Sequence, residues 1–129
     1  MAAAWVISFA LAAASLVQAQ NPQCQTEMIG QITGNPLPLQ PVPLLPPSST
    51  WDITIPSVCV NAGLLVKVCD PDGPPLPTVT PLNNREIIVK RNANPLLQPA
   101  MVYVTVFCTE SHRSNNYNVQ PTVLAVPKL

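Results

Sequence analysis

Short runs of alternating or β-branched apolar residues recur along the chain, and they predict strands. Residues 51–55 read Trp-Asp-Ile-Thr-Ile, which alternates apolar and polar side chains. Residues 64–69, 85–91 and 101–108 are rich in branched or aromatic residues, and residues 122–126 add a last short run. Period-two alternation and β-branched composition favour strands over helices. The pattern therefore predicts an all-β chain of short strands.

The run at 101–108 is predicted to lie in the middle of the fold. One of its faces carries three valines, and the other face is also apolar, with Met101, Tyr103 and Phe107. A strand that is apolar on both faces is typical of one covered on both sides. We therefore expect Tyr103, like Trp51, to be a core residue.

Turn sequences separate these runs. Residues 61–63 (Asn-Ala-Gly) have the composition and length of a three-residue hairpin loop, which would pair residues 58–60 with the strand at 64–69. Residues 70–73 (Asp-Pro-Asp-Gly) fit a type I turn, with proline at the second position and glycine at the fourth. Residues 74–84 are rich in proline and are expected to form a loop.

A dense group of prolines lies between residues 35 and 47. The segment 35–47 reads Asn-Pro-Leu-Pro-Leu-Gln-Pro-Val-Pro-Leu-Leu-Pro-Pro, which favours an extended polyproline II conformation. Its apolar residues differ from the Ser, Gly or Glu of a solvated spacer. We expect these side chains to lie against the domain or against a partner, and the candidate binding residues are Leu37, Leu39, Leu44 and Leu45.

The first residues have the pattern of a secretory signal peptide. Residues 5–17 are almost wholly apolar, and residues 17–19 (Val-Gln-Ala) are suited to cleavage by signal peptidase. The apolar run is shorter than the roughly 20 residues that span a bilayer, and no later run approaches that length. We expect residues 1–19 to be a signal peptide, 20–50 an N-terminal arm with the proline-rich extended segment, and 51–129 a β-rich domain.

Export predicts that the four cysteines form disulfides: Cys24, Cys59, Cys69 and Cys108. Four cysteines allow three pairings. If a hairpin forms, Cys69 lies opposite Ile55, roughly 13 Å along the strand from Cys59, whereas bridged Cα atoms lie within about 7 Å. Of the two remaining pairings we prefer Cys24–Cys59 with Cys69–Cys108 over Cys24–Cys69 with Cys59–Cys108.

Charged side chains are sparse. The chain carries six basic and six acidic residues, so its net charge is zero, and 9% of its residues are charged. Typical soluble domains have roughly 25% charged residues. The basic residues are scattered apart from the pair Lys90-Arg91, which argues against a nucleic-acid or membrane-surface partner. A weakly charged surface associates readily, which favours assembly with other molecules or with further copies of the chain.

Candidate catalytic and metal-binding residues form no recognisable constellation. His112 is the single imidazole, and the adjacent Ser111 rarely shares the geometry that a Ser-His pair requires. No nucleophile elbow, phosphate loop or zinc spacing occurs, and residues 70–73 lack the later ligands of a calcium loop. We therefore predict no catalytic residue, metal site or cofactor. Tyr117, within the polar run 109–118, is a candidate binding residue.

Together these features predict a small disulfide-stapled β-sandwich or partly open barrel that is secreted and is not an enzyme. The favoured function is that of a structural or interaction protein of an extracellular matrix, such as a shell, cuticle, egg coat or adhesive, with a matrix protein or polysaccharide as partner. The alternative is a soluble secreted binding module for a small apolar ligand, a carbohydrate or a protease. Such a module would use the proline segment and the loops at 74–84 and 109–118.

Overall fold

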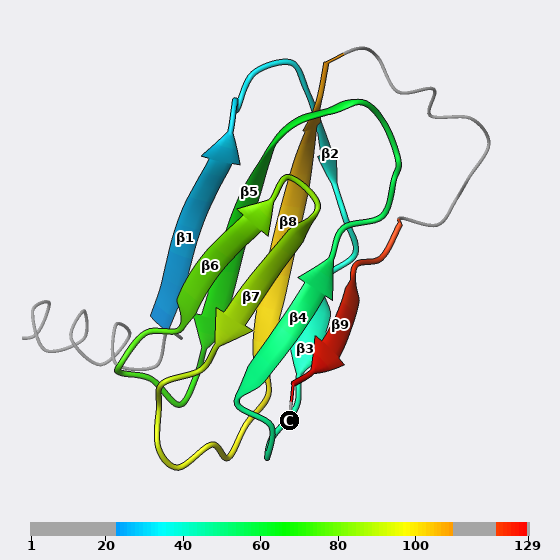
Figure 1. Cartoon of the computed structure of the whole chain (residues 1–129). Helices are drawn as coiled ribbons and strands as arrows, with labels where there is room; N and C mark the ends of the chain where they lie inside the picture. The colour runs from blue at the N-terminus through cyan, green and yellow to red at the C-terminus, as the bar shows by residue number, and fades with distance from the viewer. Residues whose placement is uncertain (1–22, 110–120, 129) are drawn as a thin grey trace, which may run out of the picture.

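The computed structural model describes residues 23–109 and 121–128, and these residues confirm the all-β class. The expected signal peptide at 1–19 lies outside the described residues, as do His112 and Tyr117. The described strands are, in chain order, β1 Gln23–Gly30, β2 Asn35–Pro38, β3 Val42–Leu44, β4 Thr50–Thr54, β5 Asn61–Asp70, β6 Thr78–Asn83, β7 Glu86–Lys90, β8 Ala100–Cys108 and β9 Leu124–Pro127 (Figure 1).

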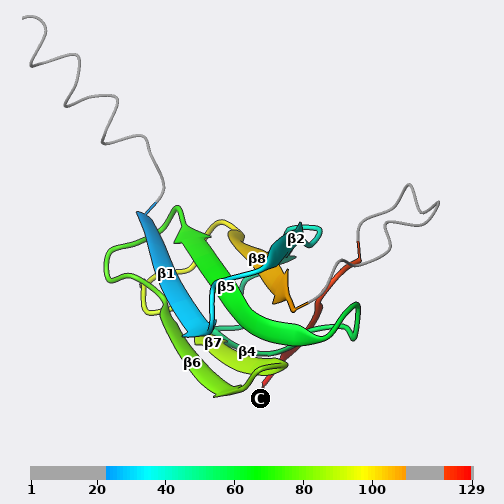
Figure 2. The ribbon, with the colours of Figure 1, turned by 90° about the horizontal axis from the view of Figure 1, so that it is seen from above.

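These strands form two antiparallel sheets that lie face to face (Figure 2). One sheet has the order β1-β5-β8-β2, and β3 also pairs with β8. The other sheet has the order β6-β7-β4-β9. An isolated parallel bridge between Gln40 and Thr122 lies outside the named strands. The chain therefore crosses between the sheets several times.

One hydrophobic core receives side chains from both sheets. Alternate residues of the central strands point into it, as period-two patterning requires. The largest fully buried apolar side chains include Leu44, Ile53, Leu64, Val66, Val68, Ile87, Val89, Val102 and Val106. Trp51 is 3% exposed and belongs to this core, as the sequence predicts.

β8 lies inside the five-stranded sheet, with β5 on one side and β2 and β3 on the other. Val102, Val104 and Val106 of this strand are buried, but Tyr103 is 41% exposed. The prediction that Tyr103 is a core residue is therefore wrong. β8 is central within its sheet, yet the second sheet covers only one of its faces.

The predicted hairpin around residues 61–63 does not form. Asn61 begins β5, and residues 55–60 carry the chain from β4 in one sheet to β5 in the other. β4 pairs with β7 and β9 instead. Gly63 is buried within β5, where a Cβ atom would clash with the carbonyl oxygen of Gln31. This glycine permits a close approach of two backbones and does not make a turn.

The turn at residues 70–73 is confirmed, since the Gly73 N–H donates to the Asp70 carbonyl at 3.3 Å. The region that follows, 74–84, contains β6 and is not only a loop. Prolines obscured this strand in the sequence. β6 is the outermost strand of its sheet, and edge strands tolerate proline because the missing N–H can face solvent.

The proline-rich segment is extended, and its two short strands pair with β8. The Leu39 N–H donates to the Val104 carbonyl at 2.8 Å. Hydrogen-bonding residues alternate along an antiparallel pair, so the proline at position 36 falls where an N–H would point away from β8. These pairings join β2 and β3 to the sheet of β5 and β8, and the chain enters the second sheet at β4.

Both disulfides form, and their pairing corrects the preferred one. Cys24 is bonded to Cys69, and Cys59 is bonded to Cys108. β1 runs antiparallel to β5 and places Cys24 directly opposite Cys69. Cys59, in the connection from β4 to β5, meets the last residue of β8. The preference for Cys24–Cys59 with Cys69–Cys108 was wrong because the sequence does not show that β1 pairs with β5.

Among the residues that the structure describes, no helix is long and apolar enough to cross a membrane.

Candidate functional site

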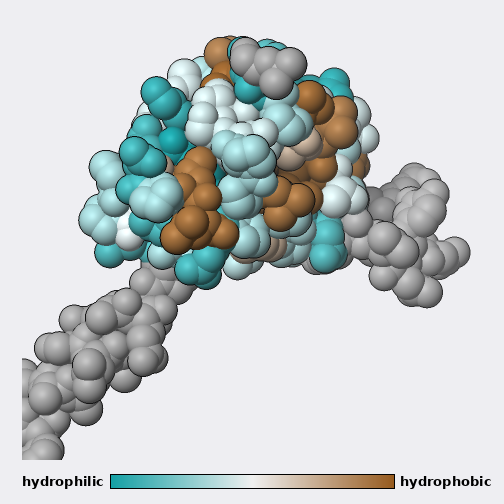
Figure 3. Space-filling view, turned by 90° about the horizontal axis from the view of Figure 1, so that it is seen from below, coloured by the Kyte–Doolittle hydropathy of each residue, from teal (hydrophilic) through white to brown (hydrophobic). Residues whose placement is uncertain are grey.

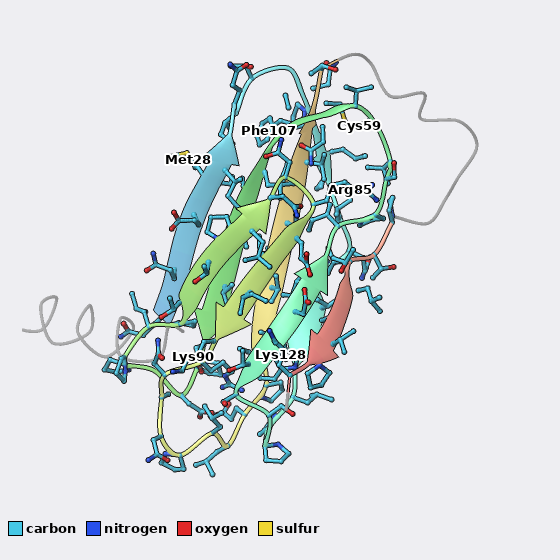
Figure 4. All side chains as sticks on the ribbon, viewed as in Figure 1. Met28, Cys59, Arg85, Lys90, Phe107 and Lys128 are labelled. Atoms are coloured by element: carbon cyan, nitrogen blue, oxygen red, sulfur yellow. A yellow bond between two sulfur atoms is a disulfide. The ribbon has the colours of Figure 1, made fainter. Side chains whose placement is uncertain are left out.

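The five-stranded sheet presents apolar side chains on the face that points away from the second sheet. These side chains alternate with core positions along each strand. They are Met28, Leu65, Met101, Tyr103 and Phe107, together with Pro36, Pro38 and Pro43 on the edge strands. We call this surface the outer apolar face. Met28 is 67% exposed and projects from β1 (Figure 4).

Lys67 is the one charged residue among the outward positions of these described strands. It lies between Thr26 and Tyr103 in the cross-strand register. Its Nζ lies 5.6 Å from the centroid of the Tyr103 ring, a cation–π contact worth about 0.5–1 kcal/mol at an exposed site. The outer apolar face is thus nearly uncharged, which suits contact with another apolar surface.

The opposite outer face, on the four-stranded sheet, is more polar. Glu86 on β7 lies near Asp52 on β4, and Asp52 Oδ1 is buried without a hydrogen-bond partner. An open, shallow depression beside them is lined by Thr54, Asn83, Arg85 and Glu86. Leu124 and Val126 of β9 are exposed on the same sheet.

The two carboxyl groups on this face influence each other. A hydrogen bond with Asp52 raises the pKa of Glu86 above its usual value of 4.5, and repulsion from the Asp52 charge and partial burial raise it further. Lys128 acts in the opposite direction on the same pKa. The pair therefore holds a proton more readily than a lone surface carboxylate does. The described lining of the depression contains no histidine or cysteine.

A buried ion pair lies at the end of the molecule where β5 and β7 finish. Arg91 is 2% exposed and Asp70 is fully buried. The guanidinium donates to Asp70 at 2.9 and 2.7 Å, to Asp72 at 3.1 Å and to the Leu44 carbonyl at 3.2 Å. All of these contacts are internal. The cluster connects strand ends, and we assign it a structural role.

Asp72 extends this cluster into the β7–β8 connection. Its carboxylate accepts hydrogen bonds from the N–H groups of Leu97 and Gln98 at 2.7 and 2.8 Å. The Gln98 bond contributes most to lowering the pKa of Asp72, the Leu97 bond and Arg91 add to it, and desolvation opposes them. Both acids of the 70–73 turn are therefore used within the fold.

Metal ligation finds no support in the part of the chain that the structure describes. No group of three or more His, Cys, Asp or Glu side chains comes together within residues 23–109 and 121–128. All four cysteines are in disulfides.

The predicted binding residues are divided between core and surface. Leu39 and Leu44 are 3% and 0% exposed, so a partner of the folded chain cannot reach them. Leu37 is half-buried and Leu45 is 58% exposed. Tyr117 lies outside the described residues.

Leu45 belongs to the β3–β4 connection, which lies at the lower end of the molecule in Figure 1. Leu97, 73% exposed, belongs to the β7–β8 connection at the same end. Figure 3 looks onto this end, where hydrophobic patches alternate with hydrophilic surface. These patches are broken up by polar groups.

Sequence reasoning missed the outer apolar face. The second face of the run 101–108 is apolar, and this pattern indicates either a strand covered on both sides or an exposed apolar surface. From the sequence we favour the first interpretation, whereas the structure has the second. Met28 gave no such signal, because β1 mixes polar and apolar residues. Only the register of β1 with β5 shows that Met28 lies opposite Leu65.

The fold defines a small all-β protein with two disulfides. Comparison with family models, curated proteins and solved structures finds no match to this chain.

Proposed function

We propose that this chain is a secreted, non-catalytic structural or interaction protein of an extracellular matrix. The matrix is of the shell, cuticle, egg-coat or adhesive type, and the partner is a matrix protein or polysaccharide. The observation that carries the proposal is the outer apolar face, where Met28 and Tyr103 are exposed beside Leu65 and Phe107 with one charge among them. Exposed apolar surfaces of this kind mark interaction sites.

The disulfides support export. Both cysteine pairs are bonded, and disulfides persist in extracellular spaces and are rare in the cytosol. The apolar N-terminal run supplies a route out of the cell.

The scaffold is best described as a sandwich that is partly closed on one side. Gln40 N–H donates to the Pro121 carbonyl at 2.8 Å and links the margin near β2 and β3 to the margin near β9. No ladder joins β1 to β6 at the other margin of the described sheets. The alternative function, a soluble binding module that recognises its ligand through the proline segment, has less support because Leu39 and Leu44 are in the core.

The test places a charge on the outer apolar face. Tyr103→Lys is compared with Val126→Lys, which adds the same charge on the opposite sheet at a residue that is 47% exposed, against 41% for Tyr103. Each variant is expressed in the secreting tissue, and the extracellular material is extracted first with salt and then with denaturant. We expect the wild type and Val126→Lys mainly in the denaturant fraction and Tyr103→Lys mainly in the salt fraction.

A wild-type chain that is retained inside the cell, or that is recovered entirely as free protein in body fluid, contradicts the proposal. Equal release of both lysine variants would show that charge alone, and not the outer apolar face, controls retention.

A further inference from the structure

One edge strand of the molecule differs from the others. Each sheet has two margins, and the described margins are formed by β1, by β2 with β3, by β6 and by β9. Every margin except β1 carries proline within its strands: Pro36 and Pro38 in β2, Pro43 in β3, Pro81 in β6 and Pro127 in β9. Proline on an edge strand blocks pairing with another chain. β1 has eight residues and no proline.

The prolines of β9 and β6 lie at positions whose N–H would point outward, where a strand of another chain would pair. Lys128 N–H donates to the Thr50 carbonyl at 2.8 Å, so alternation places the missing N–H of Pro127 on the outward side of β9. Ile55 N–H donates to the Arg85 carbonyl at 2.7 Å, so the odd-numbered residues of β7 bond to β4 and the even-numbered ones bond to β6. Pro81 lies opposite Ile87, and its missing N–H is therefore on the outward side of β6. The prolines therefore remove outward donors from these margins.

β1 keeps outward donors at Thr26 and Met28. Gln31 N–H donates to the Ala62 carbonyl at 3.0 Å and continues the β1–β5 register. Hydrogen-bonded pairs alternate along an antiparallel ladder, so the odd-numbered residues of β1 bond to β5. The N–H and C=O groups of Thr26 and Met28 then point away from β5 toward the open margin. The side chains of both residues are exposed.

For pairing between two copies of the chain, symmetry and charge favour an axis at Thr26 over one at Glu27. Two β1 strands can pair antiparallel about a two-fold axis perpendicular to the sheet. The two outer faces lie on the same side of the joined sheet only if one residue lies at the axis, opposite its own copy. An axis at Glu27 places two carboxylates directly opposite each other, which destabilises a sheet. An axis at Thr26 places Thr26 opposite its own copy through outward backbone groups. It also places Gln25 opposite Glu27 of the second copy, where an amide can donate to a carboxylate.

We propose that this chain forms a two-fold symmetric dimer in which β1 pairs with β1 of a second copy, with Thr26 at the axis. The two five-stranded sheets become one continuous sheet, and the two outer apolar faces lie on the same side of it. This proposal deepens the proposed function by naming a second copy of the chain as a partner. Only the role of the dimer in a matrix rests on the proposed function.

The test uses the disulfide-bonded chain as secreted by expressing cells and measures its mass by sedimentation equilibrium over a concentration series. Thr26→Pro removes the outward N–H at the axis, and Thr26→Val is the matched control that keeps it. We expect a reversible dimer for the wild type and for Thr26→Val, and a dissociation constant raised at least about 100-fold for Thr26→Pro. A wild type that is monomeric up to about 1 mM, or a Thr26→Pro variant that dimerises like the wild type, overturns the proposal.

The register is tested separately. Gln25→Lys places an ammonium group opposite Glu27 of the second copy twice in each dimer, and we expect it to tighten the dimer about tenfold at low salt, with the gain lost at high salt. Gln25→Glu is expected to weaken the dimer. If both variants dimerise like the wild type, the axis at Thr26 is wrong.

Hydrogen exchange keeps the proposal testable if Thr26→Pro fails to fold. In the wild-type chain the Thr26 and Met28 amides should gain protection as concentration rises through the dimer transition. Amides that exchange at the same rate in monomer and dimer overturn the proposal. These measurements are independent of where the protein resides, so a chain that dimerises in this way but is absent from any matrix would contradict only the proposed function.

Discussion

Arg91 connects three parts of the chain through one guanidinium group. It bonds to Asp70 at the end of β5, to Asp72 in the following turn and to the Leu44 carbonyl at the end of β3. From the sequence it stands out only as half of the basic pair Lys90-Arg91. The alternation of β7 nevertheless puts residue 91 on the same side as Ile87 and Val89, which are both buried. A charge in phase with core positions is therefore a sign of a buried ion pair.

We expect Asp70→Ala to lower the free energy of unfolding by about 3–5 kcal/mol, because it leaves the buried Arg91 charge without its closest partner. Urea unfolding followed by circular dichroism measures this change. The double variant Asp70→Leu/Arg91→Met removes both charges and should cost less than the single one. A loss below about 1 kcal/mol for Asp70→Ala would contradict the structural role of the cluster.

Glu86 gives the stability of the chain a pH dependence at the level of one residue. Its pKa in the folded chain is raised above the usual value of 4.5, first by its hydrogen bond with Asp52 and then by repulsion from it. The folded chain therefore binds this proton more tightly than the unfolded chain does. The contribution of Glu86 to stability is fully present below its unfolded pKa and is lost as pH rises through the raised folded pKa.

Glu86→Gln should thus stabilise the chain near neutral pH and change little below about pH 4, where Glu86 is protonated in both states. Thermal unfolding at a series of pH values checks this, with a higher Tm expected for the variant only above the transition. Glu27→Gln, on the other sheet, controls for the loss of one negative charge when both variants are measured at concentrations below the dimer transition. Equal effects of the two variants at every pH would mean that Asp52 does not act on Glu86.

At the scale of elements, local patterning predicts strands better than it predicts their neighbours. The runs at 51–55, 85–91 and 101–108 correspond to β4, β7 and β8. β2, β3 and β6 were not predicted as strands, because their prolines are typical of loops or polyproline II. Each of these strands lies at a sheet edge, where proline is tolerated because the N–H that it lacks would not pair with a neighbouring strand.

Strand pairing is the element-scale property that the sequence left open. The loop at 61–63 had the composition of a hairpin turn, yet β4 and β5 belong to different sheets. The outer apolar face was missed for the same reason, since it consists of residues from β1, β5 and β8 that only register brings together. Composition therefore indicated an interaction protein without indicating the surface.

At the scale of the whole molecule, two disulfides hold segments that are far apart in the chain. Cys24–Cys69 and Cys59–Cys108 span 45 and 49 residues. The first joins the edge strand β1 to its neighbour β5. The second joins the crossing between the sheets to the end of β8. Long closed loops restrict the unfolded chain strongly, so both bonds should contribute to the stability of the fold.

We expect removal of either disulfide, by Cys24→Ala/Cys69→Ala or Cys59→Ala/Cys108→Ala, to lower the free energy of unfolding by about 4 kcal/mol on the entropic model. That is a large share of the roughly 5–15 kcal/mol typical of whole domains. Chemical denaturation measures the loss, and non-reducing peptide mapping of the wild type should recover the two linked pairs. Recovery of a Cys24–Cys59 peptide would contradict the pairing in the structure.

The sequence by itself determined the all-β class, the turn at 70–73 and the formation of disulfides, because period-two patterning, turn chemistry and cysteine content are local or compositional properties. Only the tertiary structure decided which strands share a sheet, which cysteines meet, that Arg91 is buried and that one face of β8 is exposed. A strand's alternation shows that it has an inside and an outside. It does not show which distant strand lies beside it, and that neighbour decides what is covered and what remains free to bind.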